Sequence, residues 1–459
     1  MEMRSARDDR LLVGTALRRH LVVAVLAALL AAALGPLSGS AGEKSPEAKS
    51  GLSKYNRDLG LLMLRQVRRD IEEHYFDLTF KGLDLDAVFG QAREQIQQAQ
   101  NNSEVFRAIA MTTRAFGDSH TKFHAPGRGF DFDYGWEAMP SGKICIVHRV
   151  EKGSDAEARG LRVGDQLLAI DGAAVGRDTL RVWDYLLNAI EPHSKLTLTV
   201  AAPGGEARSL DVQTKVTPGV GTKDLYRDFA ILMRESESER RQIRSGYENF
   251  GNVLVWRMRS FEIDSADIEE GLGRARRHET LILDLRGNGG GSEESLLRVV
   301  SVLVDGGTVV GAMKTRTGEE PLVAPGKSGD GWKGRLFVLV DGRSGSAAEI
   351  FAAVVQERSR GVVFGDRTAG AVQRSIVKVN QLGSTHLVFF ATQVAVAEVQ
   401  LSSGRRLEGV GVTPDFFMPV SAADVAAQQD PVLAMALKQA GITADPAVLG
   451  RTFWADPAE

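Results

Sequence analysis

The sequence predicts a multidomain α/β protein with a helical N-terminal domain, a β-domain and an α/β core. Apolar residues recur at helical spacing over 53–115, short β-like runs between glycine turns fill 134–216, and strand-like and helix-like runs alternate from Val253 onward. Such alternation is typical of an α/β layer with largely parallel strands. The expected units are a helical domain over 53–133, a β-domain over 134–216, an α/β core over 217–420 and a helical tail over 421–459.

The composition is that of an ordinary globular protein. Of 459 residues, 43% are hydrophobic and 25% are charged, and the formal net charge is −3. No long block of like charge occurs, so the sequence does not indicate binding to nucleic acid or to an anionic membrane surface. The single cysteine, Cys145, excludes an intramolecular disulfide and a cysteine-ligated zinc site. No spacing of histidines and carboxylates indicates a metal site, and no cofactor is predicted.

The first 41 residues have the order of a secretory signal peptide. Several arginines precede the run from Leu21 to Leu34, which is almost entirely Leu, Val and Ala, and small residues follow up to Ala41. We expect cleavage after Ala41, a polar linker over 42–52, and export to the periplasm or the extracellular space. The apolar run is short for a membrane span, and an uncleaved N-terminal anchor is the alternative.

The helical domain is expected to end in a polar turn that contains a histidine. The letters FGDSHT, residues 116–121, read as a helix stop that runs into this turn. A histidine in such a turn is usually a surface or capping residue, so His120 needs partners elsewhere in the chain to have a chemical role.

The β-domain carries a specific local pattern. The run GLRVGDQLLAIDGAAV, residues 160–175, contains a glycine turn, a strand and an Asp171-Gly172 hairpin turn, and a helix is expected over Thr179 to Ala189. The run resembles the core of a PDZ domain, a module that captures carboxyl termini by adding a strand to its sheet edge. The segment Tyr134, Gly135 and Trp136 stands where that family has its carboxylate-binding loop, although it does not read Gly-Leu-Gly-Phe. A generic small β-domain is the alternative.

A glycine-rich loop follows one of the core strands. The expected strand over Leu281 to Leu285 ends in RGNGGG, residues 286–291, and a helix follows. Glycines after a strand let the backbone approach a ligand and point N–H groups at an anion. Neither Gly-Lys-Ser/Thr nor GxGxxG is present, which argues against a nucleotide site. A tight structural turn is the other alternative.

A serine is expected at a corner between a buried strand and a helix. The apolar run from Leu336 stops at Asp341-Gly342, and a helix begins near Ser346. Unpaired N–H groups and the positive end of the helix dipole meet at such a corner, which suits a nucleophilic oxygen or the binding of an oxyanion. The same letters, SAAE, also form a capping box that ends at Glu349, which is the structural alternative.

Three motifs occur in one order along the chain: LILDLRGNGGG, VLVDGRSGSAAEI and GDRTAG. Together they resemble the C-terminal processing, or tail-specific, serine protease family, whose members also carry a PDZ domain after a helical N-terminal domain. The similarity covers about residues 55–420. The resemblance implies that Ser346 is the nucleophile, and that the N–H of Ala347 and one from Gly289 or Gly290 form an oxyanion hole.

One departure from this family changes the expected base. Many members use a Ser/Lys dyad whose lysine follows the glycine of a Thr-x-Gly-Lys-Gly stretch, but this chain has Ala371 at that position. Lys378 lies on another register and is not expected to replace the lysine. A serine hydroxyl is a poor nucleophile without a base within hydrogen-bond reach, so another residue must supply it.

The tricorn-like branch of the same family uses a Ser, His, Ser, Glu tetrad in place of the dyad. Its Ser-His pair matches Ser119 and His120, and its glutamate, just before a Gly-Val-x-Pro-Asp stretch, matches Glu408. The resemblance implies that His120 takes the proton from Ser346 while Ser119 and Glu408 orient the imidazole. Asp118 is a rival orienting group.

The resemblance thus implies a secreted or periplasmic serine endopeptidase that works through an acyl-enzyme and has no cofactor. Its partners would be polypeptides that are unfolded or have free C-terminal tails, captured by the PDZ domain. The alternative is an inactive family member that binds peptides or hydrophobic ligands. The remaining histidines are expected to be structural or surface residues: His124, His148, His193, His278 and His386.

Overall fold

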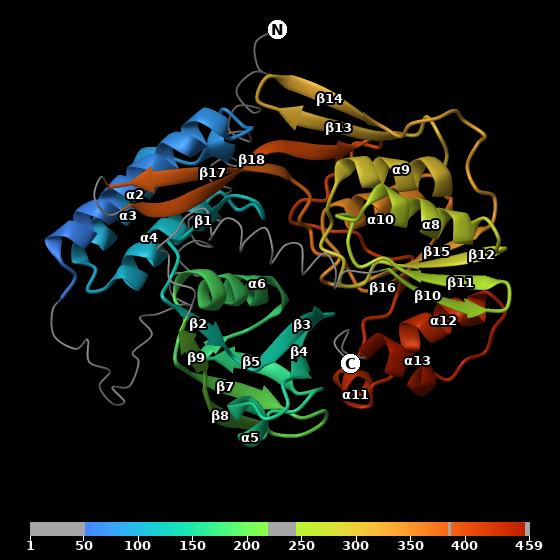
Figure 1. The fold of residues 1–459 in the computed structure, drawn as a ribbon, viewed down its shortest axis with the longest axis horizontal. Coiled ribbons are helices and arrows are strands. Elements are labelled where there is room, and N and C mark those ends of the chain that lie inside the picture. The colour runs from blue at the N-terminus through green and yellow to red at the C-terminus, as the bar shows by residue number, and fades with distance from the viewer. Residues whose placement is uncertain (1–50, 219–244, 384–386, 455–459) are drawn as a thin grey trace, which may run out of the picture.

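The protein is described here by a computed structural model, which covers residues 51–218, 245–383 and 387–454. The expected signal peptide, most of the linker and His386 lie outside the described residues. Figure 1 shows a helical unit, a β-domain and an α/β unit set around the centre of the molecule. No helix among the described residues is long and apolar enough to cross a membrane.

Three α-helices form the N-terminal unit: α2 (Lys54–His74), α3 (Leu85–Gln98) and α4 (Asn102–Arg114). Each begins after a polar residue, Ser53, Asp84 or Asn101, whose side chain accepts a hydrogen bond from a backbone N–H of the first turn. Their apolar faces share one core with part of a long strand from the far end of the chain, β18 (Val388–Leu401).

A five-stranded antiparallel sheet joins this helical unit to the α/β unit. Besides β18 it contains β1 (Lys122–His124), β13 (Val309–Thr315), β14 (Gly318–Val323) and β17 (Arg374–Leu382). The predicted antiparallel return of the late strands is confirmed by the ladder between β17 and β18. Phe390 and Val394 of β18 lie in the helical core, whereas Val399 and Leu401 lie in the α/β core. One strand therefore belongs to both units.

Strand β1 lies within residues that we expected in the helical domain. It is only three residues long, and its register is set by residues 391–393 of β18, far away in sequence. Local pattern could not show this pairing. The helices end at Arg114, and the chain then enters the sheet.

The β-domain is a sheet in the order β3-β4-β5-β7-β8, with β6 paired to β5. Its elements are β3 (Trp136–Ser141), β4 (Ile144–Val150), α5 (Asp155–Ala158), β5 (Gln166–Ile170), β6 (Ala173–Ala174), α6 (Arg177–Tyr185), a π-helical turn (Leu186–Ile190), β7 (Lys195–Ala201) and β8 (Ala207–Gln213). A short ladder of β2 (Phe130–Asp133) and β9 (Lys215–Pro218) connects its two ends. Strand β3 lies at an edge of the sheet, in contact with α6. Asp171 and Gly172 form the expected turn between β5 and β6, with φ of 48° and 80°.

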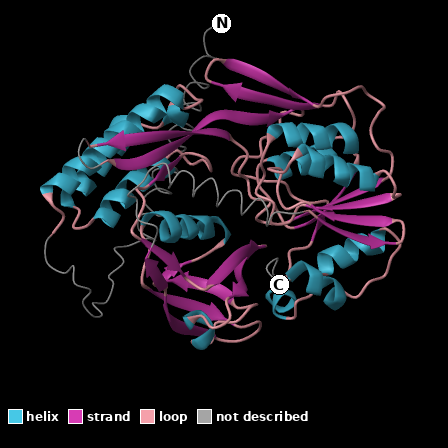
Figure 2. Ribbon diagram, in the orientation of Figure 1, coloured by secondary structure: helices cyan, strands magenta, loops and turns pink. Residues whose placement is uncertain are grey.

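The α/β unit contains the predicted parallel sheet. Its strands are β10 (Gly246–Phe250), β11 (Val253–Arg257), β12 (Thr280–Asp284), β15 (Arg335–Val340), β16 (Gly361–Gly365) and β19 (Phe416–Phe417). From β11 onward all neighbours are parallel, and β10 is an antiparallel edge strand. Helices cover both faces, which explains the continuous apolar runs in its central strands (Figure 2). On one face they are α8 (Ser265–Ala275), α9 (Glu293–Leu303) and α10 (Ala347–Glu357), and on the other α12 (Pro431–Gln439) and α13 (Pro446–Trp454).

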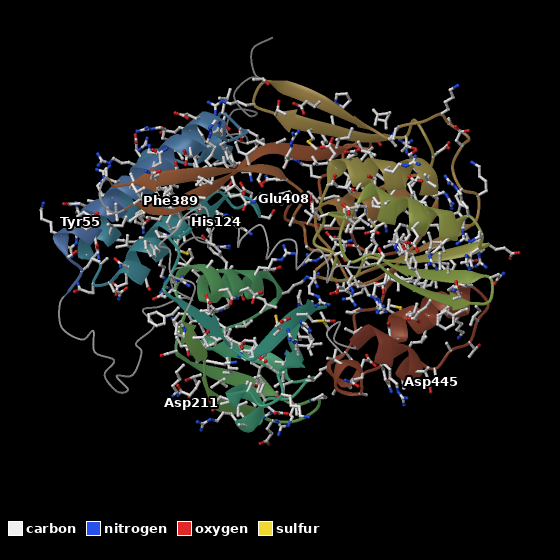
Figure 3. All side chains as sticks on the ribbon, in the orientation of Figure 1. Tyr55, His124, Asp211, Phe389, Glu408 and Asp445 are labelled. Atoms are coloured by element: carbon white, nitrogen blue, oxygen red, sulfur yellow. The ribbon has the colours of Figure 1, made fainter. Side chains whose placement is uncertain are left out.

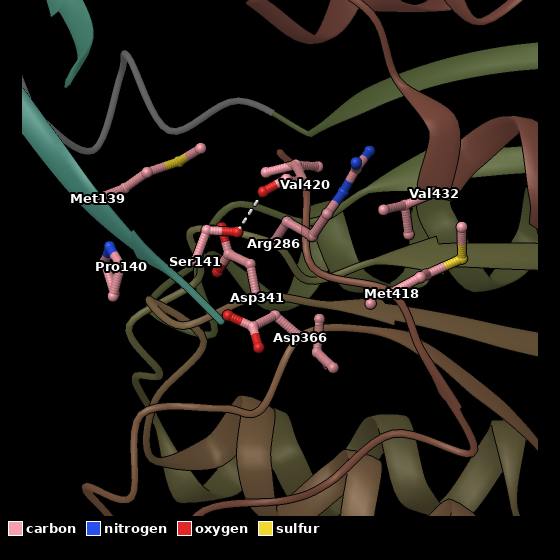
Figure 4. A pocket seen from close by; sticks show the side chains of 11 residues that line it. Met139, Pro140, Ser141, Arg286, Asp341, Asp366, Met418, Val420 and Val432 are labelled. Carbon is pink, nitrogen blue, oxygen red and sulfur yellow. Dashed lines mark hydrogen bonds between the residues drawn. The ribbon is translucent and has the colours of Figure 1, made fainter. Parts of the chain in front are cut away.

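The β-domain contacts the α/β unit through the end of β3. Ser141 Oγ donates a hydrogen bond of 2.6 Å to the carbonyl of Val420 (Figure 4), and the N–H of Gly142 donates one of 3.0 Å to Asp366. A cavity of ≈ 20 Å³ remains beside Met139 at this junction, about the space of one water molecule. The short helix α11 (Ala422–Ala426) packs against β4 from the other side.

A buried ionic network fixes the C-terminal helices to the sheet. Arg286 lies just after β12, and its guanidinium pairs with both oxygens of Asp284 and both of Asp430, at 2.7–2.8 Å. Asp430 also caps α12 through the N–H of Leu433. The side chains of the two aspartates are fully buried, and Arg286 is the cation that both share, although Asp284 also lies 3.5 Å from Arg257.

We therefore expect Arg286→Met to lower the free energy of unfolding by about 3–5 kcal/mol, because two carboxylates would stay buried without it. Urea titration followed by circular dichroism measures the loss. Arg298→Met is the matched control, since the pair of Arg298 with Glu269 is exposed and should be worth less than about 1 kcal/mol. Equal small losses in both variants would contradict the assignment.

Candidate active site

Ser346 lies at the predicted corner between β15 and α10. Its backbone has φ of 51° and ψ of −120°, a conformation that residues with a Cβ rarely adopt, and α10 begins at the next residue, Ala347. The Ser346 hydroxyl makes no capping hydrogen bond to the helix, so the capping alternative is not realised by this side chain. The residue is half-buried. A strained serine with an uncommitted hydroxyl at a helix N-terminus is the arrangement expected of a nucleophile.

Glu349, the other half of the expected capping box, has a larger role than capping. Its buried carboxylate accepts hydrogen bonds from the N–H groups of Ser346 at 3.2 Å, Gly370 at 2.6 Å and Ala371 at 2.8 Å, and from the hydroxyl of Thr368. Burial raises the pKa of this carboxyl, and these hydrogen bonds oppose the shift. One side chain thus holds the loop over 368–371 against the Ser346 corner.

The glycine loop is packed directly on Ser346. A Cβ added at Gly290 would lie 2.4 Å from Ser346 Cβ and 3.1 Å from the nitrogen of Ala347. The N–H of Gly290 donates to the side chain of Asn288 at 2.9 Å, so it is not available to an oxyanion in this conformation. Within the described part of the chain, the N–H groups of Gly289 and Ala347 donate to no protein acceptor. The sequence left Gly289 and Gly290 as alternatives for the second N–H donor of the oxyanion hole, and the geometry favours Gly289.

Ser119, His120 and Glu408 form a second cluster. Ser119 Oγ lies 2.6 Å from His120 Nδ1 and 3.2 Å from Glu408 Oε2, while the N–H of Ser119 donates to Glu408 Oε1 at 2.8 Å. Glu408 is labelled in Figure 3, at the junction of the helical and α/β units. These three residues come from segments almost 300 positions apart, and the structure brings them together as the sequence motifs predicted.

The hydrogen bonds of this cluster select a tautomer of His120. If the Ser119 hydroxyl donates to Glu408, its oxygen accepts from the Nδ1–H of His120, which leaves the lone pair on Nε2. Burial, with a contribution from the cation of Lys122, lowers the pKa of His120 to about 4. The imidazole is therefore neutral at pH 7 and able to accept a proton at Nε2.

A two-residue stretch of backbone joins this cluster to the Ser346 corner. The carbonyl of Ala371 accepts the N–H of Ser346 at 2.8 Å, and the N–H of Val372 donates to Glu408 at 2.8 Å. Among the described residues, no hydrogen bond joins Ser346 Oγ to His120. The Ser346 corner and the cluster around His120 thus belong to one hydrogen-bond network. The hydroxyl of Ser346 and the imidazole of His120 do not contact each other directly in this conformation. Such contacts are often long without a bound substrate.

Asp118, the rival orienting group, shapes the turn instead. Its carboxylate accepts the N–H groups of His120 at 3.2 Å and Thr121 at 2.7 Å, and the hydroxyl of Tyr75 at 2.8 Å. It makes no hydrogen bond to the imidazole among the interactions of residues 51–218. Lys378 lies on β17 opposite Thr392, on the sheet that carries the helical unit.

The expected carboxylate loop of the β-domain is partly occupied by its own side chains. Gly135 has φ of 67°, and its N–H donates to Asp133 at 2.9 Å. Tyr134 is buried in the β-domain core, and its hydroxyl donates to the carbonyl of Leu187. Trp136 begins β3 and pairs with Val150. This loop therefore offers a carboxylate fewer free N–H donors than its sequence position suggested.

Four other described histidines have local partners. His124 contacts Gln393, His148 contacts Arg343, His193 contacts Asp171, and His278 contacts the carbonyl of Arg274. Within the described ranges no group of three or more His, Cys, Asp or Glu side chains could hold a metal ion. Cys145 is buried in β4, and burial raises the pKa of its thiol to about 12.

Sequence reasoning missed several residues around this site. Glu349 was recognised only as a capping residue, because the loop that it binds lies 20 residues further along the chain. Lys122 and Arg181 both lower the pKa of His120, and Arg114 lowers that of Lys122, but each of these cations lies in an unremarkable local sequence. Only their placement by α4, β1 and α6 reveals them.

Comparison with known proteins agrees with this geometry. Residues 252–418, which include the Ser346 corner and Glu408, match peptidase family S41. The chain is 26% identical over 379 residues to the chloroplastic C-terminal processing peptidase of Tetradesmus obliquus, covering 77% of this chain and 76% of that protein. The chain carries a peptidase family S41 domain over residues 252–418. It is a serine-type peptidase, and it is also 24% identical over 395 residues to the carboxy-terminal processing protease CtpA of Bacillus subtilis, covering 86% of this chain and 75% of the relative.

Solved structures show the same fold. Mature CPAF in complex with lactacystin superposes with a TM-score of 0.61 at 16% identity, covering 81% of this chain and 96% of that one. At this identity the likeness is one of fold alone. The chain therefore shares its mixed α/β architecture with mature CPAF.

Gly290→Ala should abolish most peptide hydrolysis by this S41 enzyme. The added methyl group would overlap Ser346 Cβ, and Gly290 has φ of 107°, so the corner must shift and kcat should fall about 10²-fold or more. Gly289→Ala is the matched comparison: its Cβ would meet no atom within 4 Å, and the N–H is retained, so we expect a much smaller loss. Similar losses in both variants would mean that packing on Ser346 does not matter.

Proposed function

We propose that this enzyme is an exported serine endopeptidase that uses Ser346 as nucleophile and Ser119, His120 and Glu408 as its base system. One observation carries the proposal. The strained Ser346 corner, with free N–H groups at Gly289 and Ala347, is joined through residues 371–372 to a neutral histidine whose Nδ1 is held by Ser119.

The reaction follows from these groups. When the substrate seats, His120 Nε2 accepts the proton of Ser346 Oγ as the oxygen attacks the scissile carbonyl carbon. The N–H groups of Gly289 and Ala347 stabilise the resulting oxyanion. As the C–N bond breaks, His120 returns the proton to the leaving amine, and a water molecule activated by the same imidazole hydrolyses the acyl-enzyme. Glu408 and Ser119 stabilise the imidazolium that forms in between.

The proposal includes a role for the β-domain as a PDZ module. Its edge strand β3 and the adjacent α6 supply the two walls between which such modules add a peptide strand. Because the N–H of Gly135 is already bound to Asp133, recognition would rest more on the β3 edge than on that loop. The substrates would be unfolded chains with free C-terminal tails. Export rests on the N-terminal sequence, through a cleaved signal or an uncleaved anchor.

The decisive experiment is cleavage of an unfolded protein that ends in an apolar tail. We expect the mature wild type to cut it, and Ser346→Ala and His120→Ala to lose about 10⁴-fold or more in kcat. Ala371→Lys should gain little, because the contacts of this residue to the site are made by its backbone. Deleting the β-domain should reduce the preference for tailed over untailed substrate. An active Ser346→Ala variant would refute the assignment.

An inactive, ligand-binding family member is the alternative. The missing hydrogen bond between Ser346 and His120 is the one observation in its favour. A serine-directed fluorophosphonate probe separates the two, because only an activated serine reacts. Binding of the tail without probe labelling of the wild type would establish the alternative.

The pH profile provides an independent check on His120. Since burial lowers the pKa of His120 to about 4, the base stays unprotonated as the pH falls, and kcat/KM should decline only as the pH approaches that value. Lys122→Met removes a cation that opposes protonation of His120, so the acidic limb should move to higher pH. A wild-type limb at the ordinary histidine value, about 6.5, would contradict this environment.

A further inference from the structure

Three cationic side chains near His120 form one cluster: Lys122 and Arg181 lower the pKa of His120, and Arg114 lowers that of Lys122. Arg114 ends α4, Lys122 begins β1 and Arg181 lies in the middle of α6. Among the described residues, none of the three side chains forms an ion pair or a hydrogen bond, and the Nε of Arg114 is buried without a partner. Arg114 and Lys122 are partly buried, whereas Arg181 is exposed. Partly buried cations are normally paired, because desolvation of an unpaired charge is costly.

The position of Arg181 is fixed by its helix. Arg177 and Tyr185 lie one turn before and after Arg181, so the three share one face of α6. Arg177 pairs with Asp366 at 2.6 Å and donates to the carbonyl of Arg367, while the hydroxyl of Tyr185 donates to the carbonyl of Phe123 on β1. Anchored at both ends, this face spans from the loop beside Ser346 to the strand beside His120, and Arg181 lies between the two anchors.

Lys122 and Arg114 approach the same place from the helical unit. Lys122 follows His120 by two residues, and α4 packs on both β1 and the π-helical turn after α6. Burial lowers the pKa of Lys122, and the cations of Arg181 and Arg114 lower it further. The nearby carboxylates act on this cluster only through space: Glu349 and Glu408 raise the pKa of Arg181, and Asp118 raises that of Lys122. Their oxygens accept backbone N–H groups, so among the described residues the N–H donors of the three cations stay without acceptors.

We propose that Arg114, Lys122 and Arg181 form a subsite that binds a carboxylate of the peptide substrate, on the C-terminal side of the scissile bond. This subsite rests on the function proposed above. The side follows from the chemistry: His120 must reach the leaving amine, so groups around His120 face the part of the substrate that leaves. The carboxylate is supplied either by an Asp or Glu side chain or by the chain terminus.

Binding of a carboxylate at this subsite would also change the basicity of His120. A bound carboxylate offsets the cations that oppose protonation of His120, which raises the pKa of its imidazole and strengthens it as a base. An acidic substrate would then assist its own cleavage, and a purely structural cluster would produce no such effect.

The test uses quenched peptides built on a sequence that the wild type cuts. Three peptides differ only after the scissile bond: one has Asp there with an amidated end, one has Asn with an amidated end, and one has Asn with a free terminal carboxylate. Each of the first three positions after the bond is tried. We expect kcat/KM at the best position to be about tenfold higher for one of the carboxylate peptides than for the neutral one. Whichever peptide gains identifies the source of the carboxylate.

Substitutions then identify the residues that cause the preference for a carboxylate. Arg181→Gln and Lys122→Met, on different elements, should each bring the ratio of acidic to neutral cleavage towards one. Arg181→Glu should invert it in favour of a Lys peptide. Arg277→Gln removes an exposed cation after α8 and should leave the ratio unchanged. For the wild type, the acidic limb of kcat should lie at higher pH for the acidic peptide than for the neutral one.

Each outcome is decisive when labelling by the serine-directed probe confirms an intact site in every variant. Equal cleavage of the three peptides at all positions, or a preference that survives Arg181→Glu, overturns the subsite while leaving the peptidase proposal intact. A wild type that cuts no peptide and does not react with the probe overturns both.

Discussion

The hydrogen bonds of the Glu349 carboxylate are the interaction on which the rest of the site depends. A single buried side chain binds the backbone of Ser346, Gly370 and Ala371. Ala371 in turn receives the N–H of Ser346, and its neighbour Val372 reaches Glu408, which holds Ser119 and thereby His120. Without this carboxylate, the N–H groups of Gly370 and Ala371 and the hydroxyl of Thr368 would lose their acceptor.

The surroundings of His120 keep its imidazole neutral, rather than one particular hydrogen-bond partner. His120 lies where three units meet, so burial disfavours its charged form, and the cations of Lys122 on β1 and Arg181 on α6 do the same. The same junction brings the β-domain into contact with the loop beside Ser346, through Arg177 and Asp366. The proposed catalytic site and the proposed peptide-binding domain are therefore joined by direct contacts, although they belong to different units of the chain.

Much of the fold could be predicted because it follows from local sequence patterns. Continuous apolar runs and intervening amphipathic segments predicted the parallel sheet and the Ser346 corner, and the glycine turns predicted the β-domain. Strand β1 could not be predicted, since three residues carry no periodicity and their partner lies on β18. The residues Ser119, His120 and Glu408 were predicted from motifs, and the structure places them together; their catalytic roles remain proposals. The preference for Gly289 over Gly290 depends on where Asn288 points, and the cationic cluster depends on how α4, β1 and α6 meet. Neither is visible in local sequence.

Strand β18 has a consequence for the synthesis of the protein. Helices α2 to α4 leave the ribosome first, yet their core includes Phe390 and Val394, which are made close to the end. The cluster around His120 likewise cannot form before Glu408, the last of its members along the chain, has been synthesised. A nascent chain therefore exposes an incomplete helical core and carries an unassembled base. If these residues act as proposed, the site cannot be complete before Glu408 and β18 have been synthesised.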